Sequence, residues 1–205
     1  IVVVMANGLE NGRGNIVVVH GSMFCGKTRK LVEEFGNGEG VIAFRPEIDN
    51  RYGEEARIYS KSGESAPAVE INHQNPWEIY EAVEQMGGIC KVIIDEASFF
   101  PIQPFLEVVD KLATKIREVV VGGLAYDAER KPWGPILELL KWPEVTAIAL
   151  TARCDGESGE CQTPAIWSYA KVGKKEQLEK GGAERYGASC EKHYLSLHVP
   201  RVNES

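Results

Sequence analysis

Two short stretches of the chain combine residue types and spacings that suit phosphate chemistry. The first, GSMFCGKT at 21–28, follows an apolar run and matches the phosphate-binding pattern G-x-x-x-x-G-K-[ST]. Glycines let such a loop curl so that its backbone N–H groups point at phosphate oxygens, and a following helix adds partial positive charge. We predict that Lys27 reaches the outer phosphates of a nucleotide and that Thr28 binds Mg²⁺. The predicted phosphate-binding residues are Gly21, Ser22, Met23, Phe24, Cys25, Gly26, Lys27 and Thr28.

The second stretch, VIIDEASFF at 92–100, places two carboxylates at the end of an apolar run. Ligands of an open parallel sheet bind at the carboxyl ends of its strands, so we expect Asp95 to meet the Mg²⁺ held by Thr28. Glu96 is not committed to the metal, and we predict that it takes a proton from an attacking hydroxyl. The nucleophile is water in an NTPase motor or switch and a substrate hydroxyl in a kinase.

A group of cysteines and a histidine near the end of the chain predicts a zinc site. Cys190 and His193 have the C-x2-H spacing of half a site, and Cys154 with Cys161 can supply the other half. The surrounding glycine-rich, polar sequence buries too little apolar area to fold alone, so a metal would staple it. The spacing between Cys154 and Cys161 exceeds the usual one, which leaves free cysteines in a loop as the alternative. His198 is an alternative ligand to His193.

Short apolar runs alternate with helical patterns and must position these groups. The runs are nearly continuous in Val, Ile and Leu, which is typical of parallel strands covered on both faces. We therefore predict an α/β fold, a parallel P-loop sheet flanked by helices, and a mobile loop over most of the polar stretch 47–75. The expected strands are 15–20, 40–46, 91–97, 117–124 and 145–152; the expected helices follow residue 28 and lie within 76–88, 104–115 and 134–142.

Composition and charge narrow the function and divide the chain. The 205 residues carry a net charge of −7 without any Lys/Arg-rich block, which disfavours a nucleic-acid polymer as partner. No apolar run is long enough to cross a membrane, and five cysteines without a signal peptide indicate a reducing, cytoplasmic location. The expected divisions are an N-terminal tail (1–14), a P-loop ATP-binding domain (15–152), a zinc domain (153–199) and a C-terminal tail (200–205).

Taken jointly, five motifs resemble the small, tetrameric, zinc-containing (type II) thymidine kinases over about residues 15 to 195. GSMFCGKT resembles that family's G-x-M-F-S-G-K-T, IDNRY (48–52) its D-x-R-Y, and DEASFF (95–100) its D-E-[AG]-Q-F-F. GLAYDAERKPWG (123–134) resembles L-D-x-x-F-x-x-x-P-F-G, and GGAERYGASCEKHY (181–194) resembles G-G-x-x-x-Y-x-x-x-C-x-x-C/H. The five motifs together are far more specific than any one of them.

This resemblance implies a RecA-like P-loop domain and a small zinc domain that carries a lasso loop over the nucleoside. The implied reaction transfers the γ-phosphate of ATP, bound with Mg²⁺, to the 5′-hydroxyl of thymidine, giving thymidine monophosphate, in a homotetramer. Glu96 matches the general base, Asp95 the magnesium carboxylate, and Arg51 an arginine near the phosphates. The positions that match the nucleoside site are Met23, Phe99, Leu124, Ser168, Gly181, Gly182 and Tyr186.

Several positions depart from the family pattern, and most of them would touch the base. One change in an apolar pocket shifts substrate preference by about 1–3 kcal/mol, so the reaction class is more robust than thymidine specificity. The alternatives are a kinase for another deoxynucleoside, such as deoxyuridine or a modified base, an ATP-hydrolysing switch whose zinc tail docks a partner, and a paralogue that binds nucleotide without catalysis. The departures are Cys25, Ser98, Ala125, Ala128, Glu179 and Lys180.

Overall fold

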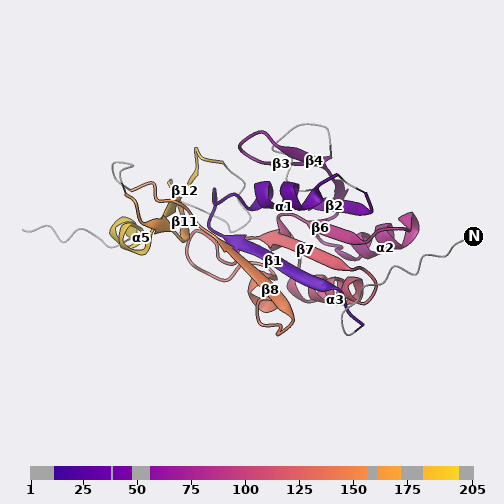
Figure 1. The fold of residues 1–205 in the computed structure, drawn as a ribbon. Helices are drawn as coiled ribbons and strands as arrows, with labels where there is room; N and C mark the ends of the chain where they lie inside the picture. The colour runs from indigo at the N-terminus through magenta and orange to yellow at the C-terminus, as the bar shows by residue number, and fades with distance from the viewer. Residues whose placement is uncertain (1–11, 38, 48–55, 157–160, 172–181, 199–205) are drawn as a thin grey trace, which may run out of the picture.

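A computed structural model describes residues 12–37, 39–47, 56–156, 161–171 and 182–198, and its centre is a six-stranded sheet. The strand order is β5-β2-β6-β7-β1-β8, and every neighbouring pair is parallel (Figure 1). The predicted α/β class with a parallel sheet is therefore confirmed. The strands are β1 (Asn15–Gly21), β2 (Val41–Pro46), β5 (Val69–Ile71), β6 (Lys91–Ile94), β7 (Glu118–Gly123) and β8 (Val145–Leu150).

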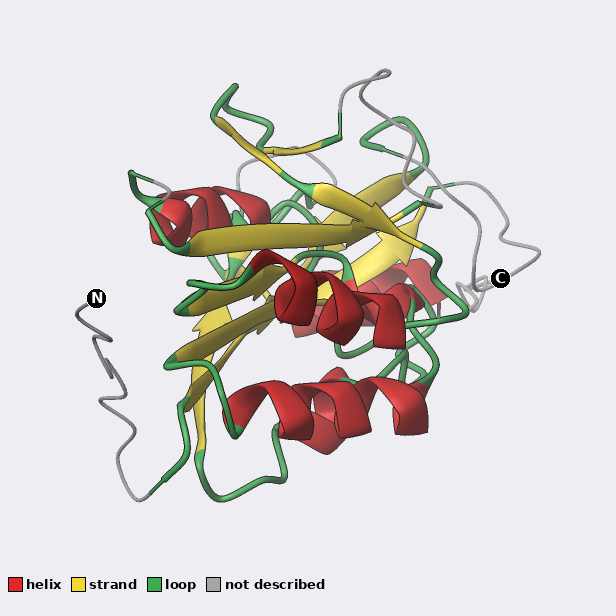
Figure 2. Cartoon of the chain, turned by 90° about the vertical axis from the view of Figure 1, so that its right-hand side faces the viewer, coloured by secondary structure: helices red, strands yellow, loops and turns green. Residues whose placement is uncertain are grey.

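Helices cover both faces of this sheet, which explains why its inner strands are apolar without alternation (Figure 2). On β6, the side chain of Ile93 packs in the same cluster as Leu31 of α1, whereas that of Ile94 packs with Phe105 of α3 on the opposite face. No helix in the described part of the chain combines the length and apolar character needed to span a bilayer. The helices are α1 (Lys27–Phe35), α2 (Trp77–Met86), α3 (Ile102–Ala113) and α4 (Ile136–Leu139).

The strand β8 departs from the expectation that every apolar run is covered on both faces. It lies at the edge of the sheet and pairs with β1 alone. Thr146, Ala147 and Ala149 are exposed, and the other residues of the strand are only half-buried. Sequence composition does not reveal this difference, because an apolar edge strand and an apolar central strand have the same residue types.

The prediction of a mobile loop over 47–75 is wrong for 57–71. β3 (Arg57–Tyr59) and β4 (Ser65–Pro67) form an antiparallel hairpin, and β5 joins the central sheet beside β2. Ile58 and Ala66 are buried in the cluster that contains Leu31 of α1, so the hairpin covers that helix. Strands of three residues are too short to show the two-residue periodicity on which strand prediction depends.

The part of the chain after β8 forms two small antiparallel sheets and a helix at one end of the central sheet (Figure 1). β9 (Ala152–Arg153) pairs with β10 (Pro164–Ala165), and β11 (Trp167–Ala170) pairs with β12 (Tyr186–Ser189). The helix α5 (Glu191–His198) follows β12. We call this group of elements the C-terminal subdomain; its buried cluster contains only small residues and cysteines, as expected of a unit that lacks a large apolar core.

Candidate active site and metal centre

The predicted phosphate loop connects the end of β1 with the start of α1. Its backbone is left-handed at Phe24, with φ 66°, and at Gly26, with φ 89°. A left-handed phenylalanine is strained, and such strain is found mainly where a loop conformation serves a function. The Nζ atom of Lys27 donates hydrogen bonds to the carbonyl oxygens of Ser22 (2.8 Å) and Gly21 (3.3 Å), so the lysine folds back over the loop.

The phosphate loop is also tied to the C-terminal subdomain. The hydroxyl of Ser22 donates to the carbonyl oxygen of Ala165 (3.1 Å), and the N–H of Met23 donates to Oγ of Ser168 (2.9 Å). Phe24 packs against the buried cluster of the subdomain, which includes Cys154 and Ala165. These contacts make the conformation of the loop depend on the subdomain as well as on the central sheet.

The acidic pair lies directly after β6, which ends at Ile94 and is therefore shorter than the expected strand 91–97. Asp95 is buried, and its Oδ1 accepts a hydrogen bond from the N–H of Glu96 (2.8 Å). Glu96 is half-buried and left-handed, with φ 52°, which is again a strained conformation for a residue other than glycine. Because only β7 separates β1 from β6 in this parallel sheet, Asp95 and Thr28 follow strands whose carboxyl ends meet at one edge.

The residues after the acidic pair form a short 3-10 helix, η1 (Ala97–Phe99), that the loop after β7 covers. The hydroxyl of Ser98 donates to the carbonyl oxygen of Leu124 (2.9 Å) and accepts from its N–H (2.7 Å). Trp133 packs edge-on against Phe99, with ring centroids 5.0 Å apart. Gly134 has φ 65°, and a Cβ atom there would lie 2.5 Å from the backbone of Ser98, so only glycine fits.

The small residues that replace larger family residues in this loop are buried. Ala125 and Ala128 are both less than a tenth exposed, and the carbonyl oxygen of Ala128 accepts a hydrogen bond from the hydroxyl of Tyr194 (2.8 Å). The ring of Tyr126 packs against Trp167, 5.4 Å between centroids. Tyr126 therefore contacts the C-terminal subdomain, whereas Trp133 of the same loop contacts Phe99.

Sequence reasoning missed Arg130, which joins the same loop to the C-terminal subdomain. Its guanidinium lies between two aromatic rings, 4.3 Å from the centroid of Trp167 and 3.8 Å from that of Tyr194. Its Nη1 also forms a 2.8 Å ion pair with Glu191, whose other carboxylate oxygen accepts a hydrogen bond from Nε1 of Trp167 (2.5 Å). No spacing signal could have found this group, because its members are brought together only by the fold.

The remaining predicted nucleoside residues belong to the C-terminal subdomain or lie outside the described residues. Ser168 and Tyr186 are buried in the paired strands β11 and β12. The N–H of Gly182 donates to Oε1 of Glu184 (2.7 Å) in the turn that precedes β12. Gly181 lies outside the described residues, as do Glu179, Lys180 and the arginine expected near the phosphates, Arg51.

The four predicted zinc ligands are brought together in the C-terminal subdomain. Their ligand atoms, which come from Cys154, Cys161, Cys190 and His193, all lie within 4.8 Å of one another. Nδ1 of His193 is 3.3 Å from Sγ of Cys154 and 3.4 Å from Sγ of Cys190. Tetrahedral zinc with bonds of about 2.3 Å would separate its ligand atoms by roughly 3.7 Å, so the donor set fits Zn²⁺ in type, number and spacing.

The electrostatics of the cysteines agree with a bound cation. Burial is the main cause that raises the pKa of Cys154, so its thiolate needs a nearby positive charge. Hydrogen bonds from the backbone and side chain of Thr163 lower the pKa of Cys161 to about 7, which favours the thiolate that zinc binds. Gly156 lies against this group, and a Cβ atom there would be 3.2 Å from Cys161 and from His193.

Three features together indicate the class of nucleotide-binding phosphotransferases. They are a P-loop sheet, an acidic pair at its carboxyl edge and a Cys3His group in a small appended subdomain. Comparison with known sequences agrees, since the profile of the thymidine kinase family matches residues 14–194. The chain is 30% identical over 199 residues to thymidine kinase of Aster yellows witches'-broom phytoplasma and 31% identical over 199 residues to that of Onion yellows phytoplasma. Each alignment covers 94% of this chain and 92% of the relative.

A thymidine kinase of Porphyromonas gingivalis is 31% identical over 197 residues, covering 94% of this chain and 90% of the relative. The chain thus belongs to the thymidine kinase family, as the resemblance of its motifs indicated.

We expect the purified protein to contain about one equivalent of zinc per chain, measured by metal analysis. Cys190→Ser should abolish zinc retention and lower the melting temperature, because the small cluster of the C-terminal subdomain cannot hold its fold without the metal. Cys90→Ser is the matched control, since Cys90 lies outside the ligand group and should leave zinc content unchanged. A metal-free, chelator-washed protein with unchanged melting temperature would contradict the zinc assignment.

We expect Arg130→Ala to lower the free energy of unfolding by about 2–3 kcal/mol, because it removes two cation–π contacts and an ion pair. Arg130→Gly removes the same contacts but relieves the left-handed backbone at φ 62°, so its loss should be about 1 kcal/mol smaller. Urea unfolding of both variants checks the difference. Equal stability of the alanine variant and the unaltered protein would show that the contacts do not hold the loop.

Proposed function

We propose that this chain is an ATP-dependent thymidine kinase that phosphorylates the 5′-hydroxyl of thymidine. The observation that carries the proposal is the arrangement of the phosphate loop after β1 and the Asp95–Glu96 pair after β6, with a single strand between them. A phosphate-binding loop alone supports many activities. Membership of the thymidine kinase family and the strained Glu96 beside a buried Asp95 favour transfer to a sugar hydroxyl.

In the proposed mechanism the phosphate loop binds the β- and γ-phosphates of ATP. The N-terminus of α1 and the backbone N–H groups of the loop, except that of Met23, which donates to Ser168, bind phosphate oxygens, and Lys27 exchanges its carbonyl partners for the outer phosphates. Arg51, which lies outside the described residues, is the predicted second cation at the transferred group. Thr28 and Asp95 would hold Mg²⁺, which neutralises phosphate charge when it is bound.

Glu96 completes the proposed reaction as the general base. Its carboxylate accepts the proton of the 5′-hydroxyl while that oxygen forms a bond to the γ-phosphorus and the bond from the γ-phosphorus to the oxygen retained by ADP breaks. The left-handed backbone at Glu96 turns the chain sharply from β6 into η1. This turn allows two adjacent residues to serve different tasks, with Asp95 toward the metal and Glu96 toward the nucleoside.

We assign the nucleoside site to the surface between η1, the loop after β7 and the C-terminal subdomain. The described residues of this proposed site are Met23, Phe99, Leu124, Ser168, Gly182 and Tyr186. Gly181, the other glycine that we assign to the lasso, lies outside the described residues. Ser168 connects the proposed nucleoside site to the phosphate loop, because its hydroxyl oxygen accepts a hydrogen bond from the N–H of Met23. The hydroxyl proton of Ser168 can still be donated to another group. The buried Ala125 and Ala128 favour a pocket shaped by Trp133 and Tyr194 rather than by the side chains of the family pattern.

We further propose a structural zinc ion on Cys154, Cys161, Cys190 and His193, a homotetrameric assembly and a cytoplasmic location. None of the five cysteines, which all lie in the described part of the chain, forms a disulfide, which is compatible with a reducing compartment. The exposed edge of β8 is available to a second subunit, as a homotetramer requires of several surfaces.

A panel of nucleosides incubated with labelled ATP and Mg²⁺ tests the proposed activity. We expect thymidine monophosphate to form fastest, with deoxyuridine or a base-modified analogue as slower substrates because differences within an apolar pocket are modest. Phosphate release that is independent of nucleoside would instead identify an ATP-hydrolysing switch. Binding of ATP without any product would identify a paralogue that has lost catalysis.

Glu96→Gln tests the proposed general base. We expect ATP affinity to be retained and turnover to fall by about 10²–10⁴-fold, because the amide cannot accept the hydroxyl proton. Glu107→Gln, on an exposed position of α3, is the matched control and should leave turnover unchanged. Steady-state kinetics of both variants decide the assignment, and full turnover of Glu96→Gln would rule out the proposed role.

A further inference from the structure

The hairpin of β3 and β4 brings a lysine to the phosphate loop. The hairpin covers α1, and its turn contains Lys61 between Ser60 and Ser62. The Nζ atom of Lys61 lies 3.3 Å from the centroid of the Phe24 ring, on the left-handed residue of the phosphate loop. Neither the motifs nor the family pattern assigned a role to this residue.

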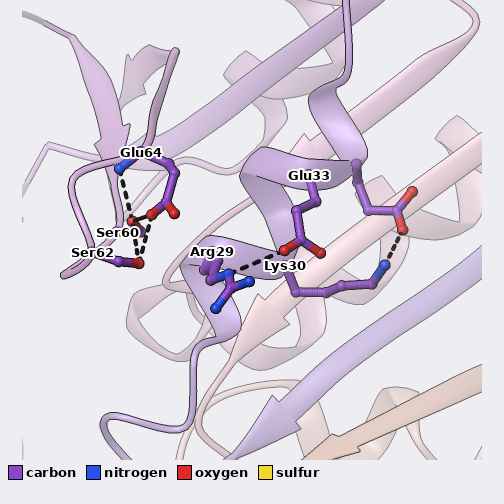
Figure 3. Close-up of polar contacts among 7 residues, drawn as sticks. Arg29, Lys30, Glu33, Ser60, Ser62 and Glu64 are labelled. Atoms are coloured by element: carbon purple, nitrogen blue, oxygen red, sulfur yellow. Dashed lines mark hydrogen bonds and ion pairs between the residues drawn. The ribbon is translucent and has the colours of Figure 1, made fainter.

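The turn that carries Lys61 is braced by a charged side chain (Figure 3). The carboxylate of Glu64 accepts hydrogen bonds from the hydroxyls of Ser60 and Ser62, the latter at 2.6 Å, and the N–H of Glu64 donates to Oγ of Ser60 (3.1 Å). The backbone closes the same turn, since the N–H of Ser60 donates to the carbonyl oxygen of Glu64 (2.8 Å). Lys61 thus lies in a turn whose conformation is fixed by hydrogen bonds.

The brace persists at every pH at which the protein would work. The two serine hydroxyls, followed by the backbone N–H of Glu64 and the charge of Arg29, lower the pKa of Glu64 to about 2. Because this value lies below the ordinary one, the brace stabilises the folded turn above the ordinary carboxyl pKa and is lost only as the pH falls toward about 2. Arg29 belongs to α1, the helix that begins at the end of the phosphate loop. The turn of the hairpin and the phosphate loop therefore both lie next to α1 (Figure 3).

Lys61 also acts on the C-terminal subdomain. The pKa of Glu184 is lowered chiefly by the backbone N–H groups of Gly182 and of Glu184 itself, and the positive charges of Arg185 and Lys61 add to this effect. Glu184 lies in the turn before β12, on the subdomain to which the phosphate loop is bonded. Lys61 therefore contacts the phosphate loop at Phe24 and adds its positive charge to the surroundings of an acidic residue of the subdomain.

We propose that Lys61 is a further phosphate-contacting residue, which leaves the Phe24 ring to bind the outermost phosphate of ATP. The inference rests on the proposed function for its ligand, a nucleoside triphosphate held by the phosphate loop. A lysine ammonium is a compact charge on a flexible four-carbon stem, so a small rotation of the stem moves it from the ring toward a neighbouring site. A charge-assisted hydrogen bond to phosphate is stronger than a half-exposed cation–π contact, which favours the phosphate over the Phe24 ring as a partner of the ammonium.

Binding of ATP and ADP in the absence of nucleoside, measured by calorimetry, tests the proposal. Lys61→Met keeps the length of the side chain and removes its charge, and we expect it to weaken ATP binding about tenfold and ADP binding less than threefold, since ADP lacks the outermost phosphate. Lys61→Arg should restore most of the ATP affinity. Lys111→Met, on an exposed position of α3, is the matched control and should bind both nucleotides normally.

Two results would overturn the inference, and a third would overturn only the proposed reaction. Unchanged ATP affinity of Lys61→Met would show that the lysine does not reach the phosphates. Equal loss of ATP and ADP affinity with a lowered melting temperature would show that Lys61 only holds the hairpin on the loop. A protein that binds ATP with this dependence on Lys61 but phosphorylates no nucleoside would keep the inference and refute the proposed kinase reaction, so the two failures are distinguishable.

Discussion

The rest of the site depends on the contact between the phosphate loop and the C-terminal subdomain. Ser22 and Met23 are hydrogen-bonded to that subdomain, and Phe24 packs into its buried cluster. The buried cluster of the subdomain is small, and three of the four cysteine and histidine side chains that gather there belong to residues packed in or against it. The phosphate loop and the cysteine–histidine group thus contact the same subdomain, although none of the four residues of that group belongs to the loop.

The parts of the fold that sequence predicted are those with strong local signals. The phosphate loop, the acidic pair and the central apolar strands each depend on residues that are adjacent in the chain. The hairpin of β3 and β4 was missed because its strands have three residues each and its stability comes from packing on α1. The Arg130 group was missed for a related reason, since its partners Trp167 and Tyr194 are remote in sequence and the favourable contact exists only after folding.

The departures from the family pattern have a physical interpretation in the structure. The hydroxyl of Ser98 forms hydrogen bonds with both backbone groups of Leu124, which fixes the loop after β7 on η1. The family pattern has a glutamine at this position, whose amide would be available to a ligand. The carbonyl oxygen of Ala128 accepts a hydrogen bond from the hydroxyl of Tyr194. The C-terminal subdomain thus contacts the chain at a position where the family pattern has a large aromatic residue. Both departures thus take part in hydrogen bonds that hold the loop after β7 to its neighbours.

The place of β1 between β7 and β8 also affects how the chain folds during synthesis. The ribosome releases β1 long before either neighbour has been made, so the apolar residues of this strand remain without their partners while most of the protein is translated. Parallel sheets whose neighbouring strands are distant in sequence form slowly, because the entropy of closing a long loop is lost before strand pairing stabilises the chain. The pairing of β1 therefore belongs to the late steps of folding, after β7 and β8 have been synthesised.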